Sequence, residues 1–350
     1  MYKEDVTLME PSKPLPKSKR RRRLLTGVRA PEPRTTMKAA AIDGFGPPSV
    51  FKFRALPVPE LGPGDVLIAL HAAGVGTWDT DIRAGWWPEG RPKFPLVLGS
   101  DGAGIIEAKG SRVRRFNIGD PVWASEFINP KGGFYAEYVV VNAEHVGRVP
   151  KRLDLAHAGA AVATGLTALQ GIDDHLRVRR GETVLIFGAS GAVGTLAVQF
   201  AKWRGARVLA TASGRAATML MRRLGASGVF DPRSKRGLEQ LRELAPDGID
   251  AVLALANGGA LERCLELVLP GGRVAYPNGV EPEPRRRPKI RLLAYDGTAG
   301  PHEFARLNRA VDEARLEVPI AAVYSLAQAA KAHERLKRGR VVGRVALRIR

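Results

Sequence analysis

Cysteine is almost absent from this sequence: Cys264 is the only one among 350 residues. A single thiol excludes a disulfide within the chain and any zinc cluster built from several thiolates of one chain. Long apolar runs are missing as well, since none approaches the roughly 20 residues of a membrane span. No apolar segment follows the basic N-terminus, as a signal peptide would require. We therefore expect a protein of the reducing cytoplasm without a membrane span.

Acidic residues are also few: 35 Asp and Glu stand against 55 Lys and Arg, a formal net charge of +20. Residues 1–36 are rich in Pro, Lys and Arg and contain KSKRRRR at 17–23. This segment is expected to be a disordered basic extension. Its basic run could bind nucleic acid or a membrane surface, or be a solvated arm. The other arginines are spread along the chain, which favours weak contact with anionic partners and predicts no specific nucleic-acid site.

Residues 37–150 contain short apolar segments separated by Gly and Pro turns. This pattern is typical of a compact, mostly β domain. The expected strands are Lys38–Ile42, Val66–Ala72, Ala103–Ala108, Pro121–Ala124 and Ala136–Asn142.

From residue 151 the pattern changes to alternating helices and strands. It predicts an α/β domain over 151–288, with a doubly wound parallel sheet whose last strand is Arg273–Pro277. Residues 289–350 are expected to return to the β domain through a helix at Leu326–Arg338 and a strand at Gly343–Ile349. The other expected helices are Leu155–Asp173, Ala192–Lys202, Arg215–Leu224, Lys235–Leu244 and Leu261–Leu269, and the other strands Val184–Phe187, Ala206–Thr211, Gly228–Asp231 and Ala251–Ala256.

The stretch TVLIFGASGAVG at 183–194 organises the chain. An apolar run ends on Gly188, Gly191 and Gly194, and a helical segment follows at once. Glycines permit a tight turn and a close approach to a pyrophosphate, and the helix N-terminus offers free N–H groups. The alternative is an ordinary turn between strand and helix that binds no ligand. The second strand after the helix supplies the βαβ context that the dinucleotide motif requires. The predicted dinucleotide-binding residues are Gly188, Ala189, Ser190, Gly191, Ala192, Val193 and Gly194.

The end of the second strand indicates which dinucleotide binds. A site for NAD places an acidic residue there to hold the ribose hydroxyls. This chain has TASGR at 211–215, with no acid. The hydroxyl of Ser213 and the guanidinium of Arg215 suit a 2′-phosphate, so the sequence favours NADPH.

The chain resembles the medium-chain dehydrogenase/reductase superfamily, and within it the zinc-free quinone oxidoreductase branch. The matching segments run from residue 37 to residue 350 and include MKAAAIDGFG, PGDVLIALHAAGV, WDTDIRAG, FPLVLGSDGAGIIEAKGSRVRRFNIGDPV, GGFYAEYVVV, ATGLTALQG and LPGGRVAYPNG. The resemblance implies a GroES-like β domain joined to a Rossmann domain. It also implies cofactor contacts at Thr164, Asn257 and the Asn278–Gly279–Val280 loop. The family has a tyrosine where this chain has Pro232, beside Arg233, so Arg233 joins Arg215 as a candidate for the phosphate.

Zinc-dependent relatives place a cysteine where this chain has Gly76 and a histidine where it has Ser100. Neither residue can ligate zinc, so no metal site is expected. Without a Lewis acid, reduction of an already polarised acceptor is easier than alcohol oxidation.

The acceptor pocket also departs from the quinone oxidoreductase pattern, which has Asn and two tyrosines where this chain has Gly76, Asp81 and Trp87. The candidate catalytic residues are Asp81, Trp87 and Thr164. Asp81 would be a proton donor if burial raised its pKa, and is otherwise an ordinary surface carboxylate. Trp86 and Trp87 form either an aromatic wall over a flat acceptor or ordinary packing.

These observations predict an NADPH-dependent oxidoreductase that transfers a hydride to a quinone or an α,β-unsaturated carbonyl. The alternatives are a zinc-free alcohol or enoyl-thioester dehydrogenase, and a crystallin-like protein that binds NADPH and RNA without robust turnover. The family resemblance further implies a homo-oligomer, expected to be a dimer paired through the edge strand Arg273–Pro277.

Overall fold

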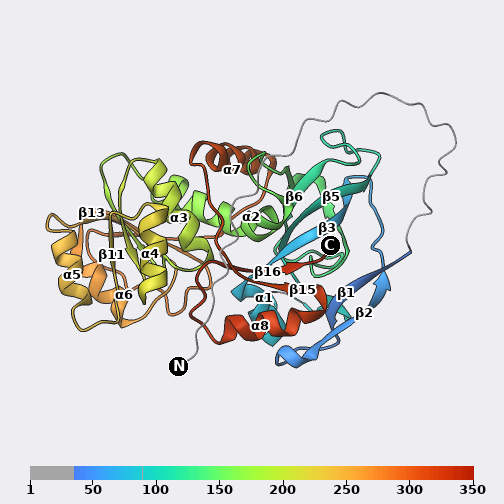
Figure 1. Cartoon of the computed structure of the whole chain (residues 1–350), viewed down its shortest axis with the longest axis horizontal. Helices are drawn as coiled ribbons and strands as arrows, with labels where there is room; N and C mark the ends of the chain where they lie inside the picture. The colour runs from blue at the N-terminus through green and yellow to red at the C-terminus, as the bar shows by residue number, and fades with distance from the viewer. Residues whose placement is uncertain (1–34, 89) are drawn as a thin grey trace. The chain divides into compact units, whose positions relative to one another are not determined.

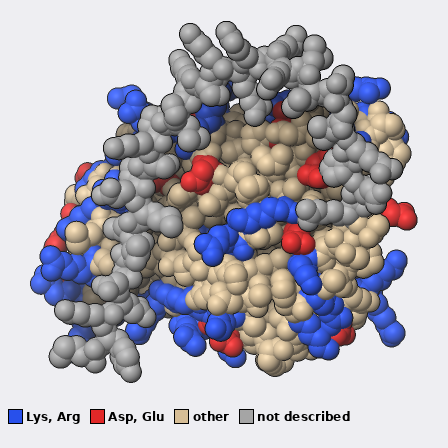
Figure 2. Space-filling view, turned by 45° about the vertical axis from the view of Figure 1, so that its right-hand side comes forward, with Lys and Arg blue, Asp and Glu red and all other residues tan. Residues whose placement is uncertain are grey.

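The computed structural model describes residues 35–88 and 90–350. Thr36–Arg350 forms one compact unit. The expected disordered extension therefore lies almost wholly outside the described residues. Figure 2 shows one face of the molecule, on which Lys and Arg side chains lie at several separate places and do not form one block.

The expected α/β architecture is confirmed, and its first part is mostly β. A three-stranded sheet has the order β2-β1-β4, and a seven-stranded sheet has the order β15-β16-β3-β5-β6-β8, with β7 paired to β3. Helix α1 follows directly after β3 (Figure 1). The bounds are β1 Thr36–Ile42, β2 Phe51–Pro57, β3 Asp65–Val75, α1 Thr77–Ala84, β4 Leu96–Val97, β5 Asp101–Lys109, β6 Pro121–Ser125, β7 Tyr138–Asn142, β8 Val146–Arg148, β15 Ile320–Ser325 and β16 Arg344–Arg348.

The second part is a six-stranded parallel sheet of order β11-β10-β9-β12-β13-β14. Alternate residues of β9 point to opposite faces: Val184 and Ile186 pack with α2, α3 and α4, whereas Leu185 and Phe187 pack with α5 and α6. The sheet is therefore doubly wound. The bounds are α2 Leu155–Gln170, β9 Thr183–Phe187, α3 Ala192–Trp203, β10 Arg207–Thr211, α4 Arg215–Leu224, β11 Gly228–Phe230, α5 Gly237–Leu244, β12 Ile249–Ala254, α6 Gly259–Cys264, β13 Val268–Pro277 and β14 Arg291–Tyr295.

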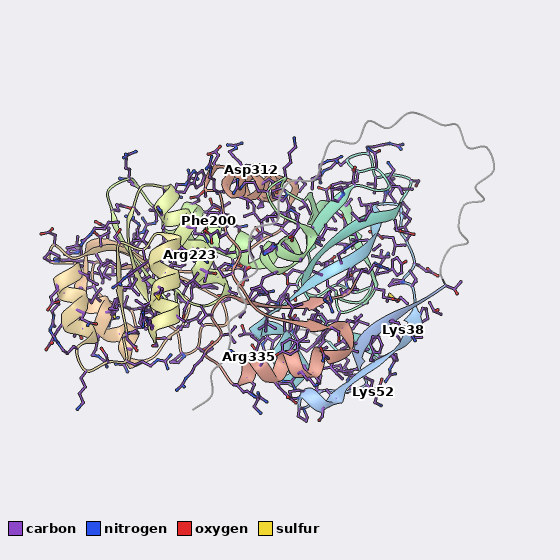
Figure 3. All side chains as sticks on the ribbon, in the orientation of Figure 1. Lys38, Lys52, Phe200, Arg223, Asp312 and Arg335 are labelled. Carbon is purple, nitrogen blue, oxygen red and sulfur yellow. The ribbon has the colours of Figure 1, made fainter. Side chains whose placement is uncertain are left out.

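Helix packing follows the apolar pattern of the sequence. Phe200 of α3 is fully buried, whereas Arg223 of α4 is exposed and pairs with Glu317 at 3.2 Å (Figure 3). One helical segment, Leu155–His175, is long and apolar enough to cross a membrane, but 72% of its most apolar window is buried inside the protein. It packs as a core helix against β3, β5 and α3.

The C-terminal segment returns to the β part as expected. Helix α7 spans Pro301–Glu313, α8 spans Ala329–Lys337, and β16 pairs antiparallel with β3. Strand β15 pairs parallel with β16 and was not expected from the sequence.

The prediction that Arg273–Pro277 is the edge strand of the parallel sheet is wrong. Strand β14 pairs with β13 over Arg273–Pro277, so that β13 is an interior strand and β14 is the edge. The Pro- and Arg-rich residues 281–288 look like a loop that ends the domain, and only pairing through space shows that the chain then rejoins the sheet.

A buried ion pair joins the last strand to the β part. Arg344 Nη2 lies 2.7 Å from Asp101 Oδ1, and the two side chains are 3% and 0% exposed. A Cβ atom built at Gly74 would lie 2.3 Å from Arg344 Nη2, so only glycine leaves room for the guanidinium there.

Replacing Arg344 by Met should lower the free energy of unfolding by about 3–5 kcal/mol, because it leaves the Asp101 carboxylate buried without its partner. Arg348→Met is the matched control, since Arg348 lies exposed on the same strand and its loss should change stability by less than about 0.5 kcal/mol. Urea denaturation measures both. Equal effects of the two variants would contradict the role given to the pair.

Candidate functional site

The glycine turn after β9 has the geometry of a dinucleotide loop. Gly188 has a φ of +85°, and its N–H donates to Thr211 Oγ1 at the end of β10, 2.8 Å away. A Cβ atom at Gly194 would lie 2.5 Å from the Gly188 carbonyl oxygen, so the first turn of α3 packs directly on the loop. Gly191 is the N-cap, and no acid lies in the first helical turn. The turn therefore presents a helix N-terminus suited to an anion.

The predicted selectivity residues lie at the end of β10. Gly214, with a φ of +82°, separates Ser213 from Arg215, which is the first residue of α4. Both Ser213 and Arg215 are exposed. Their side chains are therefore accessible to a ligand that follows the strand end.

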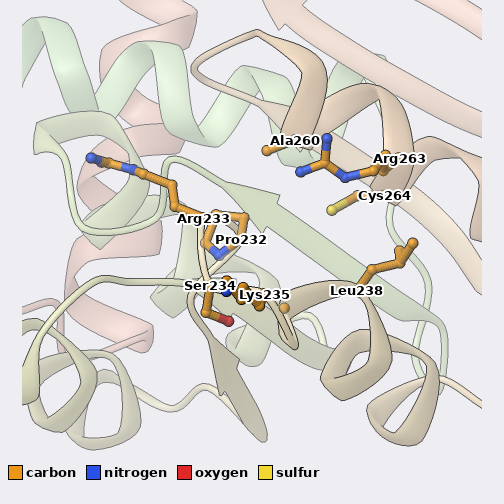
Figure 4. Close-up of a pocket in the computed structure, with 9 residues that line it drawn as sticks. Pro232, Arg233, Ser234, Lys235, Leu238, Ala260, Arg263 and Cys264 are labelled. Atoms are coloured by element: carbon orange, nitrogen blue, oxygen red, sulfur yellow. The ribbon is translucent and has the colours of Figure 1, made fainter.

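Arg233 lies in a pocket of about 280 Å³ between the β11–α5 loop and α6 (Figure 4). Lys235 and Arg263, which the sequence analysis did not single out, line the same pocket. Packing of α5 beside α6 places Arg263 on the same pocket as the loop that carries Arg233 and Lys235. The remaining lining residues are Pro232, Ser234, Gly237, Leu238, Ala260 and Cys264.

The loops after β12 and β13 carry the other predicted cofactor residues. Asn257 donates its side-chain amide to the Pro282 carbonyl and accepts from the Gly258 N–H, so both ends of its side chain are engaged. Asn278 donates to Asp296 at 2.7 Å, and Gly279 has a φ of +88°. Val280 is half-buried. Both loops follow the carboxyl ends of parallel strands, as the glycine turn does.

A chain of contacts connects the glycine loop to the β part. Gly343 N–H donates to the Ser190 carbonyl at 2.9 Å, and the next residue, Arg344, forms the buried pair with Asp101. Asp101 also accepts from the Ala163 N–H at 3.2 Å. Thr164, next in the chain, is 1% exposed and donates its hydroxyl to Ala161.

Ser100, which precedes Asp101, belongs to a buried polar cluster with α1. Trp78 Nε1 donates to Ser100 Oγ at 2.9 Å. Ser100 Oγ lies 3.0 Å from Asp79 Oδ1 and 3.1 Å from the Phe127 carbonyl, and its single proton can serve one of them at a time. Asp79 also accepts from the Gly76 N–H at 2.8 Å.

The same cluster extends to the C-terminal helix. Arg83 Nε donates to His333 Nδ1 at 3.3 Å, so the ring hydrogen of His333 lies on Nε2, 3.3 Å from the Tyr135 hydroxyl. Tyr135 in turn donates to Asp79 Oδ2 at 3.0 Å. Burial and the nearby Arg83 charge lower the pKa of His333 to about 3, which keeps the ring neutral. Burial raises the pKa of Asp79 to about 6 against the opposing Gly76 hydrogen bond.

The residues at the family's metal position do not fit a zinc ion. A Cβ atom at Gly76 would lie 2.5 Å from the Trp78 ring, so the indole fills the space beside Gly76 that a ligating side chain would need. Ser100 is engaged by Trp78 and Asp79. Within residues 35–88 and 90–350, no three His, Cys, Asp or Glu side chains come together to hold a metal.

The three candidate catalytic residues occupy different environments. Asp81 is exposed near the end of α1, and partial burial of its carboxyl raises its pKa against the lowering effect of Arg83. Trp87 is half-buried against the β core, whereas Trp86 is 50% exposed. Thr164 is buried in α2. The three side chains thus share no hydrogen bond, whereas Trp78, Asp79, Ser100 and Tyr135 are joined by hydrogen bonds into one polar cluster.

All four of those cluster residues lie in segments that carry the family resemblance. Trp78 and Asp79 lie in WDTDIRAG, Ser100 lies at the family's metal position, and Tyr135 lies in GGFYAEYVVV. The sequence carried no signal that Tyr135 contacts Asp79, 56 residues earlier, or His333, 198 residues later.

Comparison with known proteins agrees with this architecture. Residues 62–151 match the alcohol dehydrogenase GroES-like domain, and residues 224–347 match the zinc-binding dehydrogenase family. Quinone oxidoreductase of Homo sapiens is 32% identical over 319 residues, which cover 87% of this chain and 94% of that protein.

Solved structures are similar over most of their length. An NAD-dependent alcohol dehydrogenase superposes with a TM-score of 0.83 at 29% identity, over 90% of this chain and 100% of that one. A mycobacterial protein complexed with NADPH superposes with a TM-score of 0.77 at 28% identity, over 89% and 100%. The chain is therefore an oxidoreductase that belongs to the medium-chain dehydrogenase/reductase superfamily, in its quinone oxidoreductase-like branch.

Proposed function

We propose that this oxidoreductase transfers a hydride from NADPH to a quinone or an α,β-unsaturated carbonyl compound, without zinc and in the cytoplasm. The observation that carries the proposal is the Gly343–Ser190 hydrogen bond beside the Arg344–Asp101 pair. These contacts connect the dinucleotide loop to the polar cluster around Ser100. NADPH would supply the hydride, and the protein would position the two reactants and exclude water.

The cofactor would be held at the carboxyl edge of the parallel sheet. The backbone of 188–194 would bind the pyrophosphate at the N-terminus of α3. Ser213 and Arg215 would bind the 2′-phosphate, with Arg233 and its pocket neighbours Lys235 and Arg263 adding positive charge. Gly279 and Val280, with the side chains of Asn257 and Asn278, would form the wall of the loops after β12 and β13. A relative complexed with NADPH supports this choice of dinucleotide.

The acceptor would lie near α1. Asp81 is the candidate proton donor, because partial burial raises its pKa. Trp87 would form part of the wall of the acceptor site. Thr164 is buried, so we assign it a positioning role through the segment of α2 that hydrogen-bonds Asp101.

The side chains around Ser100 support the proposed zinc independence. Gly76 offers no ligand atom, and the Trp78 indole lies against it. A quinone or an enone is already polarised, so its reduction needs no Lewis acid.

Alcohol oxidation is the second candidate, favoured by the likeness to an NAD-dependent alcohol dehydrogenase. The absence of an acid in 211–215 argues against NAD as the cofactor. The RNA-holding alternative has the chain's excess of positive charge in its favour.

We also propose three structural parts: a β domain over 37–150, a Rossmann domain from 151, and a C-terminal return. We place the boundary between the Rossmann domain and the C-terminal return beyond Tyr295 instead of at residue 288, because β14 belongs to the parallel sheet.

We further propose a dimer, formed by pairing of the free edge of β14 with that of a second copy. Sedimentation equilibrium at micromolar concentration should give twice the chain mass. A strict monomer would contradict this assembly.

Purified protein should oxidise NADPH in the presence of quinones or enones, and prolonged treatment with a strong chelator should leave the rate unchanged. Elemental analysis should find no stoichiometric zinc. Zinc lost together with activity would overturn the zinc-free assignment. Tight RNA binding at physiological salt with no reduction of any acceptor would favour the RNA-holding protein.

Arg215→Ala should raise the KM for NADPH about 10–100-fold, because a charge-assisted hydrogen bond to the 2′-phosphate is lost. The KM for NADH should barely change. Arg222→Ala is the matched control, since Arg222 lies exposed on the same helix two turns later. Ser213→Asp should shift the preference further toward NADH. Equal weakening of both cofactors in Arg215→Ala would mean that Arg215 supports the fold instead of binding the phosphate.

A further inference from the structure

Two polar side chains meet where the last two strands of the parallel sheet end. Strand β13 ends at Pro277 and β14 ends at Tyr295, and the residues that follow them are Asn278 and Asp296. Asn278 Nδ2 donates to Asp296 Oδ2 at 2.7 Å, and the Asn278 N–H donates to the Tyr295 carbonyl at 2.9 Å. Both residues are exposed. We call Asn278 and Asp296 the amide–carboxylate pair.

The segment that carries Asp296 is fixed on helix α2. The buried Gln170 side chain donates to the Thr298 carbonyl at 2.8 Å and accepts from the Thr298 N–H at 3.0 Å. A Cβ atom at Gly297 would lie 2.5 Å from the Thr167 hydroxyl oxygen, so the backbone lies directly against the helix. The carboxylate therefore extends from a backbone held on both of its hydrogen-bonding groups, as a residue that positions a ligand requires.

The amide–carboxylate pair offers a ligand negative charge. Because a carboxylate can only accept hydrogen bonds, the Asn278 amide turns its NH2 group to Asp296 and its carbonyl oxygen away from it. Within residues 35–88 and 90–350, this amide is the one donor that contacts the carboxylate, and no Lys or Arg forms an ion pair with it. The charge of Asp296 is therefore not neutralised by a neighbouring cation.

The order of the strands puts the pair on the nicotinamide side of the proposed cofactor site. The glycine turn follows β9, and the candidates for the 2′-phosphate, Ser213 and Arg215, follow β10 on one side of it. A dinucleotide lies across the carboxyl ends of the strands, so its other half must extend over β12, β13 and β14. At about 4.8 Å per strand, the ends of β13 and β14 lie roughly 10 and 14 Å from that of β9.

We propose that the Asp296 carboxylate faces the nicotinamide ring and selectively stabilises its oxidised, cationic form. This inference rests on the proposed function and adds a residue to it. When a hydride, one proton with two electrons, passes from NADPH to the acceptor, the neutral ring becomes a cation, and the reduced acceptor takes up a proton from Asp81 or water. The attraction between Asp296 and the ring grows as the hydride leaves. Asp296 therefore favours hydride donation by the cofactor.

Isothermal titration calorimetry with NADP+ and with NADPH, each without an acceptor, tests this charge effect. Asp296→Asn keeps the shape of the side chain and removes its charge. It should raise the Kd for NADP+ about 3–10-fold and the Kd for NADPH less than about 2-fold. Asp312→Asn is the matched control, because Asp312 is an exposed carboxylate on α7 and its loss changes the net charge equally. It should leave both Kd values unchanged.

Equal changes of the two Kd values in Asp296→Asn, or no change in either, would overturn the inference. The same titrations with NAD+ and NADH separate it from the proposed function. If the variant loses affinity for the oxidised form alone, while the wild type prefers NADH or reduces no quinone or enone, the charge effect stands and the proposed reaction fails. If the wild type reduces quinones with NADPH and the variant shows no selective loss of NADP+, the reaction stands and the inference fails. A wild type that binds neither dinucleotide would refute both.

Discussion

The buried pair between Arg344 and Asp101 is the interaction on which the site depends. Arg344 and Asp101 lie 243 positions apart in the sequence. The residue before each of them contacts a different part of the site: the dinucleotide loop for Arg344 and the polar cluster for Asp101. Gly343, before Arg344, holds the dinucleotide loop through Ser190, and Ser100, before Asp101, holds Trp78 and Asp79. Because an unpaired charge in the interior is costly, the pair connects the loop and the cluster whenever the protein is folded. The last strand of the chain thus serves the site as well as the sheet.

Small residues make room for this arrangement. Gly74 leaves space for the Arg344 guanidinium, and Gly76 leaves space for the Trp78 indole. The guanidinium lies 5.2 Å from the centre of the Trp78 ring, so cation and ring reinforce one another. Where metal-dependent relatives hold an ion through side chains, this chain has a hydrogen-bonded indole, serine and aspartate. The centre is therefore built from packing and hydrogen bonds, which is compatible with an acceptor that needs no Lewis acid.

Along the polar cluster, each hydrogen-bond donor meets an acceptor. Arg83 determines the tautomer of His333, which lets His333 donate to Tyr135 and Tyr135 donate to Asp79. Burial keeps His333 neutral and raises the pKa of the Tyr135 hydroxyl well above its usual range. Asp79 consequently sits at the end of an ordered chain of donors that begins on α1 and passes through α8. Such a chain holds Ser100 and Trp78 in one orientation.

Local pattern in the sequence was enough for the fold class and the dinucleotide loop. The formation of a glycine turn between an apolar strand and a helix depends on residues that are close in the sequence. The same holds for the strands at Thr36–Ile42 and Thr183–Phe187. Periodicity missed β14, because its short run follows a Pro- and Arg-rich segment and only pairing with β13 makes it a strand. It also gave no reason to join Arg344 to Asp101, Tyr135 to His333, or Trp86 to Phe127. Those contacts bridge distant segments, so their existence depends on how the sheets and helices pack, and the tertiary structure alone decides them.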